Sequence, residues 1–174
     1  QDFSTEEINR NLPVWMTYEP GSTFKIITLA ASLEEKIVDL DNDTFDDSGA
    51  IQVENATIHC WKHGGHGHQT YLQVVENSCN PGFVNLGLKL GKEKLFDYIN
   101  KFGFGEKTGV DLNGEGKGII FNLDRVGNVE LATTAFGQGV SVTPIQQITA
   151  VSAAINGGYL YKPYIVKSLN EPET

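Results

Sequence analysis

Residues 18–31 read Tyr18-Glu19-Pro20-Gly21-Ser22-Thr23-Phe24-Lys25-Ile26-Ile27-Thr28-Leu29-Ala30-Ala31, and this stretch decides the fold. The proline and glycine at its start break regular structure, and an apolar run follows them. The apolar residues of this run are spaced nearly all around a helix. Such a helix packs inside a protein and not on its surface. The sequence therefore predicts a buried helix over roughly 22–36.

The first turn of this helix carries an S-x-x-K sequence, Ser22-Thr23-Phe24-Lys25. Positions i and i+3 share one face of a helix. A serine hydroxyl is a poor nucleophile until a base takes its proton. Burial and the positive end of a helix both lower the pKa of a lysine, which lets its amine act as that base. Taken alone, the same four residues also suit a helix cap and a surface lysine.

A second short motif, Ser78-Cys79-Asn80, has the form S-x-N. Together with S-x-x-K, it is typical of the motif set of β-lactamases and penicillin-binding proteins. In that interpretation Ser78 relays a proton between Lys25 and the leaving group, and Asn80 hydrogen-bonds a substrate amide. We expect Ser22 Oγ within hydrogen-bond reach of Lys25 Nζ, with Ser78 close to the same lysine.

Other elements follow from apolar spacing and from glycine and proline breakers. Apart from the buried helix, we expect an irregular segment over 1–19, loop and hairpin over 39–58, no helix over 59–69, helices over 70–77, 81–91, 92–102, 129–136 and 144–156, a glycine-rich loop over 103–128, and a strand over 159–169.

Several longer segments resemble the transpeptidase domain of class B penicillin-binding proteins, in family order over residues 18–166. The segment Tyr18–Lys25 looks like the family's nucleophile segment. The others are Thr108-Gly109-Val110-Asp111-Leu112 with Gly114-Glu115, Phe136-Gly137-Gln138-Gly139 with Val142-Thr143-Pro144-Ile145-Gln146, and Asn156-Gly157-Gly158 with Lys162-Pro163-Tyr164-Ile165-Val166. The segment around Trp61 and Gly65-His66-Gly67 is similar to the elongation and sporulation branches of the family.

The resemblance implies an α+β fold of the serine β-lactamase and transpeptidase type, here mainly its helical part with little of the central sheet. It implies a peptidoglycan D,D-transpeptidase with Ser22, Lys25, Ser78 and Asn80 as catalytic residues. The implied ligands are a peptidoglycan stem peptide and β-lactam antibiotics. The implied location is the extracytoplasmic face of the bacterial membrane, in a membrane-anchored parent with cell-wall synthesis partners.

The family's third motif, a K-[ST]-G strand, should follow Val166, and the sequence ends before it. Lys107-Thr108-Gly109 has the right letters but lies where the family has its structural loop, so we reject it as the third motif. The missing strand supplies one N–H of the family's oxyanion hole, and loss of such a donor typically lowers rates by about 10²–10³. We therefore interpret residues 1–174 as a single partial transpeptidase domain, cut at both ends.

Composition excludes some partners. The 174 residues are 40% hydrophobic and 20% charged, enough apolar material for a core, and the net charge is −9. A nucleic-acid partner would need a basic face, so none is expected. No stretch reaches the 18 or more apolar residues of a membrane span.

Histidine, cysteine and aspartate gather in one part of the chain and indicate a metal site. Thiolate and imidazole suit zinc, which prefers four tetrahedral ligands. Some family members of the branches named above carry zinc beside the S-x-N motif, and the pattern here is similar. The expected zinc ligands are Asp46, Cys60, His66 and Cys79, with His68 or His63 replacing Asp46 if it cannot reach. A Cys60–Cys79 disulfide and unbound thiols remain the alternatives.

Two further functions compete with the transpeptidase. One is a non-catalytic module stabilised by zinc, and the other is a β-lactamase or β-lactam sensor sharing Ser22 and Lys25. The sequence shows no deacylating glutamate motif that favours hydrolysis.

Overall fold

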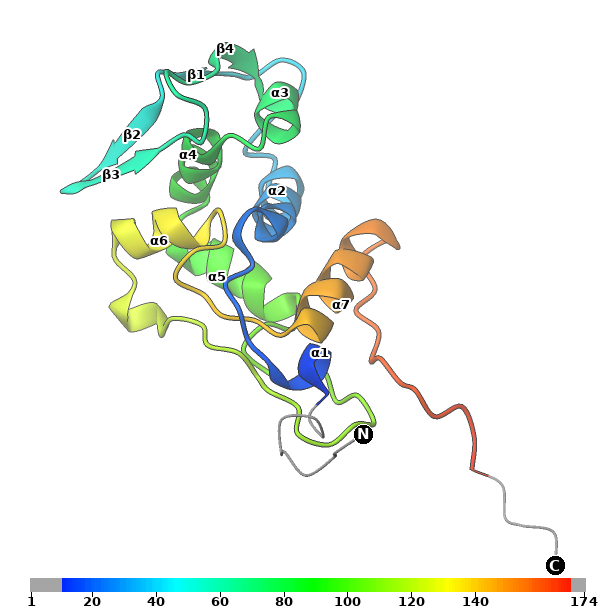
Figure 1. Cartoon of the computed structure of the whole chain (residues 1–174). Helices are drawn as coiled ribbons and strands as arrows, with labels where there is room; N and C mark the ends of the chain where they lie inside the picture. The colour runs from blue at the N-terminus through cyan, green and yellow to red at the C-terminus, as the bar shows by residue number, and fades with distance from the viewer. Residues whose placement is uncertain (1–10, 170–174) are drawn as a thin grey trace, which may run out of the picture.

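The computed structural model describes residues 11–169 and combines helices with short antiparallel strands (Figure 1). The helices are α1 (Leu12–Trp15), the 3-10 turn η1 (Gly21–Phe24), α2 (Lys25–Glu34), α3 (Tyr71–Glu76), α4 (Asn80–Leu90), α5 (Lys92–Lys101), the 3-10 turn η2 (Leu123–Arg125), α6 (Asn128–Thr134) and α7 (Pro144–Ile155). The strands are β1 (Thr44–Asp47), β2 (Ala50–Val53), β3 (Ala56–His59) and β4 (Gly67–Thr70).

The predicted buried helix is present as η1 followed directly by α2. Phe24, Ile27 and Ala31 are completely buried on it. Its neighbours are α4, α5 and α7, which surround it on several sides. This packing explains why its sequence is apolar nearly all round, because a helix with a solvent face would carry a polar stripe there.

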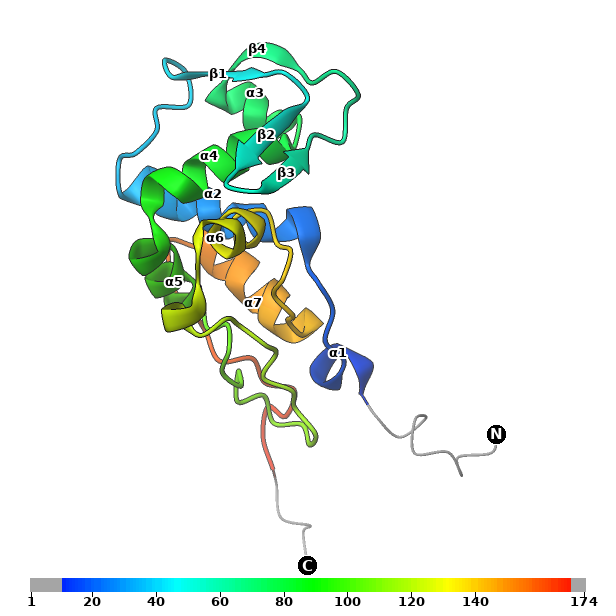
Figure 2. The same cartoon turned by 90° about the vertical axis from the view of Figure 1, so that its left-hand side faces the viewer.

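The strands form two small antiparallel sheets at one end of the molecule. β1 pairs with β4, and β2 pairs with β3 as a hairpin. Figure 2 shows both sheets above α2, next to α3 and α4. A second apolar cluster fills the space beneath them, with Val53, Tyr71, Val74 and Phe83 nearly or fully buried. The sheets are thereby fixed to the helices that carry the S-x-x-K and S-x-N motifs.

Most of the expected elements are present, with boundaries shifted by one or two residues. Two expectations fail. Within 1–19, residues 1–10 lie outside the described part of the chain, but the segment expected to be irregular contains α1. The strand expected over 159–169 is absent as well, because a strand needs a hydrogen-bonded neighbour and no described segment pairs with this one along a ladder.

Two isolated bridges connect the segment before α7 to the segment before Ser22 and to the glycine-rich loop. Tyr18 pairs with Val142, and Ile119 pairs with Ser141, both antiparallel. These bridges bring the segment that precedes Ser22 against the segment that enters α7. No helix within residues 11–169 is long and apolar enough to cross a membrane.

Candidate active site

Lys25 joins the two serine motifs. It is only 4% exposed, although it belongs to the first turn of α2. Its ammonium donates hydrogen bonds to the Ser78 carbonyl oxygen at 2.7 Å, to Ser78 Oγ at 3.0 Å and to Asn80 Oδ1 at 2.7 Å. Lys25 Nζ also lies 5.2 Å from the centroid of the Phe83 ring. The S-x-x-K and S-x-N motifs therefore form one site.

The environment of Lys25 lowers the pKa of its amine. Burial lowers the pKa of Lys25 from 10.5 to about 8, because a buried ammonium loses its hydration. Three hydrogen bonds hold the side chain in one place. A substantial fraction of the lysine is consequently neutral just above neutral pH, as a general base requires.

Ser22 lies in η1, one turn before Lys25, and its side chain is exposed. Its carbonyl oxygen accepts the Lys25 backbone N–H. The expected hydrogen bond from Ser22 Oγ to Lys25 Nζ is absent among residues 11–169, while the expected contact of Ser78 with Lys25 is present. All three Lys25 hydrogen bonds go to the S-x-N turn, which leaves Ser22 Oγ free towards solvent.

The S-x-N turn links α3 to α4 through an unusual backbone. Ser78 has φ +48°, in the left-handed region that a residue with a Cβ rarely adopts. The N–H groups of Ser78 and Cys79 donate to the carbonyls of Val75 and Val74, which closes α3. Asn80 then opens α4 with Pro81 next to it, in the first turn where proline is favoured. This turn aims Ser78 and Asn80 at the same lysine.

The Asn80 amide is fixed at both ends. Its Oδ1 accepts from Lys25, and its Nδ2 donates to the His59 carbonyl oxygen at 3.4 Å. An ammonium can only donate, so the Lys25 contact assigns the oxygen of this amide. The end of β3 therefore helps to orient a residue of the S-x-N motif.

Next to this turn, four potential metal ligands converge. Asp47, Cys60, His66 and Cys79 place one ligand atom each within 4.8 Å of one another. His66 Nδ1 lies 3.0 Å from Asp47 Oδ2 and 3.4 Å from Cys60 Sγ, and Cys79 Sγ donates to Asp47 Oδ2 at 3.3 Å. Among residues 11–169, the buried His66 Nε2 has no hydrogen-bond partner. This group is a possible metal-binding cluster.

Three of the four expected ligands are brought together, and Asp47 takes the place of Asp46. Successive side chains of a strand point to opposite faces. In β1 this alternation makes Asp46 exposed and Asp47 buried, and Asp46 pairs instead with His68 at the surface, 2.8 Å away. The expectation of Asp46 is therefore wrong, and neither His68 nor His63 belongs to the cluster.

The charge states within the cluster are interdependent. Burial raises the pKa of Cys79 to about 12 and also raises the pKa of Cys60. Burial alone would raise the pKa of Asp47 too, but hydrogen bonds from Cys60, Gly49 and His66 hold it well below its usual range. Both thiols are free and protonated next to an ionised carboxylate. A metal ion held by Cys60 and Cys79 would displace their thiol protons, as in cysteine sites generally.

The comparisons with known proteins agree with this geometry. Residues 2–174 match the family model described as the penicillin binding protein transpeptidase domain. The chain belongs to this family. It is 71% identical to stage V sporulation protein D of Bacillus subtilis over 174 residues, which is all of this chain and 27% of that protein. The resemblance to the sporulation branch is thus confirmed.

Two further relatives support the assignment. Peptidoglycan D,D-transpeptidase FtsI of Escherichia coli is 28% identical over 177 residues, covering 96% of this chain and 28% of that protein. The crystal structure of penicillin binding protein 3 from Mycobacterium tuberculosis complexed with aztreonam superimposes with a TM-score of 0.84 at 34% identity, covering 90% of this chain and 35% of that one. The α+β transpeptidase-type fold is confirmed, and the chain spans about a quarter of the length of the curated relatives it matches.

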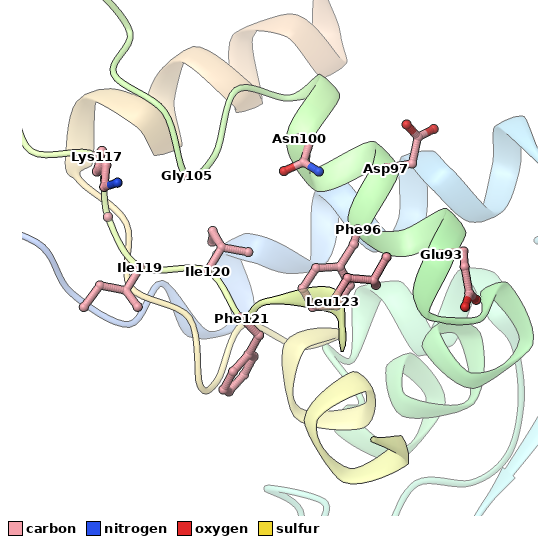
Figure 3. Close-up of a pocket in the computed structure, with 11 residues that line it drawn as sticks. Glu93, Phe96, Asp97, Asn100, Gly105, Lys117, Ile119, Ile120, Phe121 and Leu123 are labelled. Atoms are coloured by element: carbon pink, nitrogen blue, oxygen red, sulfur yellow. The ribbon is translucent and has the colours of Figure 1, made fainter. Parts of the chain in front are cut away.

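A separate hollow lies away from the Lys25 site. Figure 3 shows it between α5 and the loop over 117–123, with a volume of about 650 Å³. Phe96 and Phe121 supply apolar surface, while Glu93 and Asp97 stand on its α5 side. None of the expected catalytic or metal-ligating residues lines it.

Two contributors to the site were missed from the sequence. The inward orientation of Asp47 could have been predicted from the apolar Phe45, because residues two positions apart in a strand lie on the same face. Trp61 is 66% exposed, yet its indole N–H donates to the Asn77 carbonyl at 2.8 Å and its ring meets His66 edge-on at 5.3 Å. Trp61 thus connects the histidine loop to the end of α3, a contact that the family resemblance of its segment did not reveal.

Proposed function

We propose that this chain carries the acylation site of a peptidoglycan D,D-transpeptidase, with Ser22 as nucleophile. The observation that carries the proposal is the buried Lys25 ammonium, hydrogen-bonded to both Ser78 and Asn80 one turn after Ser22. A longer protein that contains this chain supplies the remaining strand of the site, including the family's K-[ST]-G motif.

The first half of the reaction needs a proton acceptor for Ser22. Neutral Lys25 takes the Ser22 Oγ proton as the oxygen attacks the carbonyl carbon of the donor peptide. Ser78 Oγ, 3.0 Å from Lys25 Nζ, passes the proton on to the leaving amine. The exposed Ser22 side chain turns from solvent towards Lys25 during this step.

The substrate is a stem peptide of peptidoglycan, and a β-lactam reacts with the same serine. Asn80 has one amide hydrogen beyond the one given to His59, and this hydrogen binds a substrate carbonyl. The acidic net charge fits a function without nucleic acid. The parent protein acts on the outer face of the cytoplasmic membrane, held there by an anchor and by other cell-wall synthesis proteins.

We propose in addition that Asp47, Cys60, His66 and Cys79 hold a structural zinc ion. Two thiolates, one imidazole and one carboxylate make a closed four-ligand set of the kind zinc prefers. The proposal rests on the convergence of these four donors, with His66 facing the cluster through Nδ1. The ion would stabilise the S-x-N turn, because Cys79 stands between Ser78 and Asn80.

The family match favours the transpeptidase over the non-catalytic module and the β-lactamase. A fluorescent penicillin tests the proposal in a longer protein that contains this chain. The wild type should become covalently labelled, and Ser22→Ala should not. Ser152→Ala, at an exposed serine of α7, is the matched control and should label normally. Full labelling of Ser22→Ala would overturn the proposal.

A further inference from the structure

We propose that a hollow next to Asn80 binds the acceptor peptide, whose amine takes the acyl group from Ser22. This inference rests on the proposed transpeptidase function. The hollow has a volume of about 340 Å³. It is bounded by β3, by α6 and by the loop that follows α6, and Asn80 forms part of its wall.

The hollow is connected to both halves of the catalytic site. Asn80 in its wall accepts the Lys25 hydrogen bond. On the other side, Gln138 lines the hollow, and the preceding residue, Gly137, accepts a hydrogen bond from the Gly21 N–H at 3.0 Å. Ser22 follows Gly21 directly. A molecule in the hollow therefore lies next to the S-x-N turn and to the loop that supports the nucleophile.

The lining matches an uncharged stretch of peptide. Ile58, Val129 and Phe136 give it apolar surface, suited to the methyl groups of alanine side chains. His59 and Gln138 are exposed, and within residues 11–169 neither side chain makes a hydrogen bond, so both are available to peptide amides. Exposed polar groups around an apolar floor are typical of a ligand pocket.

The absence of charged lysine, arginine, aspartate and glutamate side chains from the lining favours the acceptor peptide over the donor peptide. A D,D-transpeptidase donor ends in a carboxylate next to the bond that breaks, and such a group calls for lysine or arginine. No lysine or arginine lines this hollow. The acceptor amine must instead arrive unprotonated, and the lining also contains no aspartate or glutamate that would hold it as an ammonium.

In the transfer step, every bond and proton is accounted for. The acceptor nitrogen attacks the carbonyl carbon of the Ser22 ester, a C–N bond forms and the C–Oγ bond breaks. The proton lost by the amine returns to Ser22 Oγ through Lys25 and Ser78, so no other reactant is needed. Asn80, held by the β3 carbonyl of His59, lies in the wall of the hollow and also contacts Lys25.

Separate measurement of the two half-reactions tests the proposal in a longer protein that contains this chain. Acylation is followed with a fluorescent penicillin, and transfer is followed with a synthetic stem pentapeptide as acyl donor and a synthetic stem tripeptide bearing a free side-chain amine as acceptor. Gln138→Ala removes a free amide, and Val129→Trp fills the hollow. Both should leave acylation within about twofold and raise the KM for the tripeptide about tenfold, a loss of about 1.4 kcal/mol of binding.

Leu123→Trp, which fills the separate hollow of Figure 3, is the matched control and should change neither half-reaction. An unchanged tripeptide KM in both variants would overturn the acceptor site. If Val129→Trp does not fold, Gln138→Ala decides alone, because Gln138 is exposed and its side chain supports no other described residue.

A binding measurement separates failure of this inference from failure of the proposed function. The ¹⁵N-labelled chain is titrated with the same tripeptide, and backbone shifts should appear at residues 56–59 and 129–138. A wild type that no penicillin acylates overturns the transpeptidase function, whereas shifts confined to other residues overturn only the acceptor site.

Discussion

Lys25 Nζ lies 2.7 Å from Asn80 Oδ1, and this hydrogen bond joins the first turn of α2 to the first turn of α4. The two residues are 55 positions apart in sequence. Their contact places a buried ammonium between the S-x-x-K and S-x-N motifs. We expect that ammonium to lose its proton when Ser22 reacts.

Acylation should therefore depend on pH through Lys25. The base is the neutral amine, and burial lowers the pKa of Lys25 to about 8. The acylation rate should fall about tenfold per pH unit below 8 and level off above it. Rates with a fluorescent penicillin between pH 6 and 9.5 test this. Lys25→Met should lower the rate about 10³-fold and remove the dependence, and a wild-type rate that is flat over this range would contradict the role of Lys25.

The stability of the folded protein should also depend on pH through Lys25. Because the folded pKa of Lys25 is below its unfolded value of 10.5, the unfolded chain binds the extra proton more readily. The resulting penalty is fully present below pH 8 and disappears as pH rises from about 8 to 10.5. The wild type should thus gain stability relative to Lys25→Met over that interval in denaturant titrations. A constant difference between the two would show that Lys25 has an ordinary pKa.

The proposed zinc site predicts different effects of substituting the neighbouring residues Asp46 and Asp47. Asp47→Asn should lose bound zinc in native mass spectrometry and lower the melting temperature, because Asp47 is a buried member of the cluster. Asp46→Asn is the matched control, since Asp46 faces solvent and contacts only His68 among the described residues. Equal zinc content in both variants would remove Asp47 from the ligand set, and a wild type without zinc would reject the site.

The loop after α6 should be intolerant of a single methyl group at Gly137. Gly137 has φ +85°, and an added Cβ would overlap the carbonyl oxygen of Gly21. Gly137→Ala should destabilise the fold by about 2 kcal/mol or more and slow acylation by shifting the turn of Ser22. Gly158→Ala has a similar φ of +93° without any atom within 4 Å, so it should cost only about 1 kcal/mol. Equal losses of stability would show that the Gly21 contact is unimportant.

Asp111 should order the segment that follows α7. Its carboxylate accepts the N–H groups of Ile165 and Val166 at 2.7 and 2.6 Å, and these bonds lower the pKa of Asp111. Asp111→Asn should speed limited proteolysis within residues 159–169. Asp124→Asn, in η2, is the control and should not change the cleavage rate there. Unchanged cleavage in Asp111→Asn would show that these two bonds do not hold the segment.

The sequence predicted those elements whose structure is determined by residues close together in the chain. The apolar run after Lys25 predicted α2 because burial all round a helix needs no knowledge of the partners. Pro144 and Gly157-Gly158 likewise marked the limits of α7. The contact of Lys25 with Ser78 was expected from the motifs and their family order, not from spacing alone.

The wrong predictions concern features that depend on segments far apart in the sequence. A run of five aspartates between 39 and 47 does not reveal which carboxylate faces inward, because a shift of one residue reverses every side chain of a strand. Residues 159–169 alternate like a strand, but a strand forms only beside a partner. The absent Ser22–Lys25 hydrogen bond follows from competition, since Ser78 and Asn80 already accept the Lys25 donors.

The central claim is that Ser22 forms the covalent ester. A longer protein that contains this chain is treated with a penicillin, digested and sequenced by tandem mass spectrometry. We expect one penicilloyl group per chain, located on Ser22 and absent after Ser22→Ala. An adduct on Ser78 or on any other residue, with Ser22 unmodified, would contradict it.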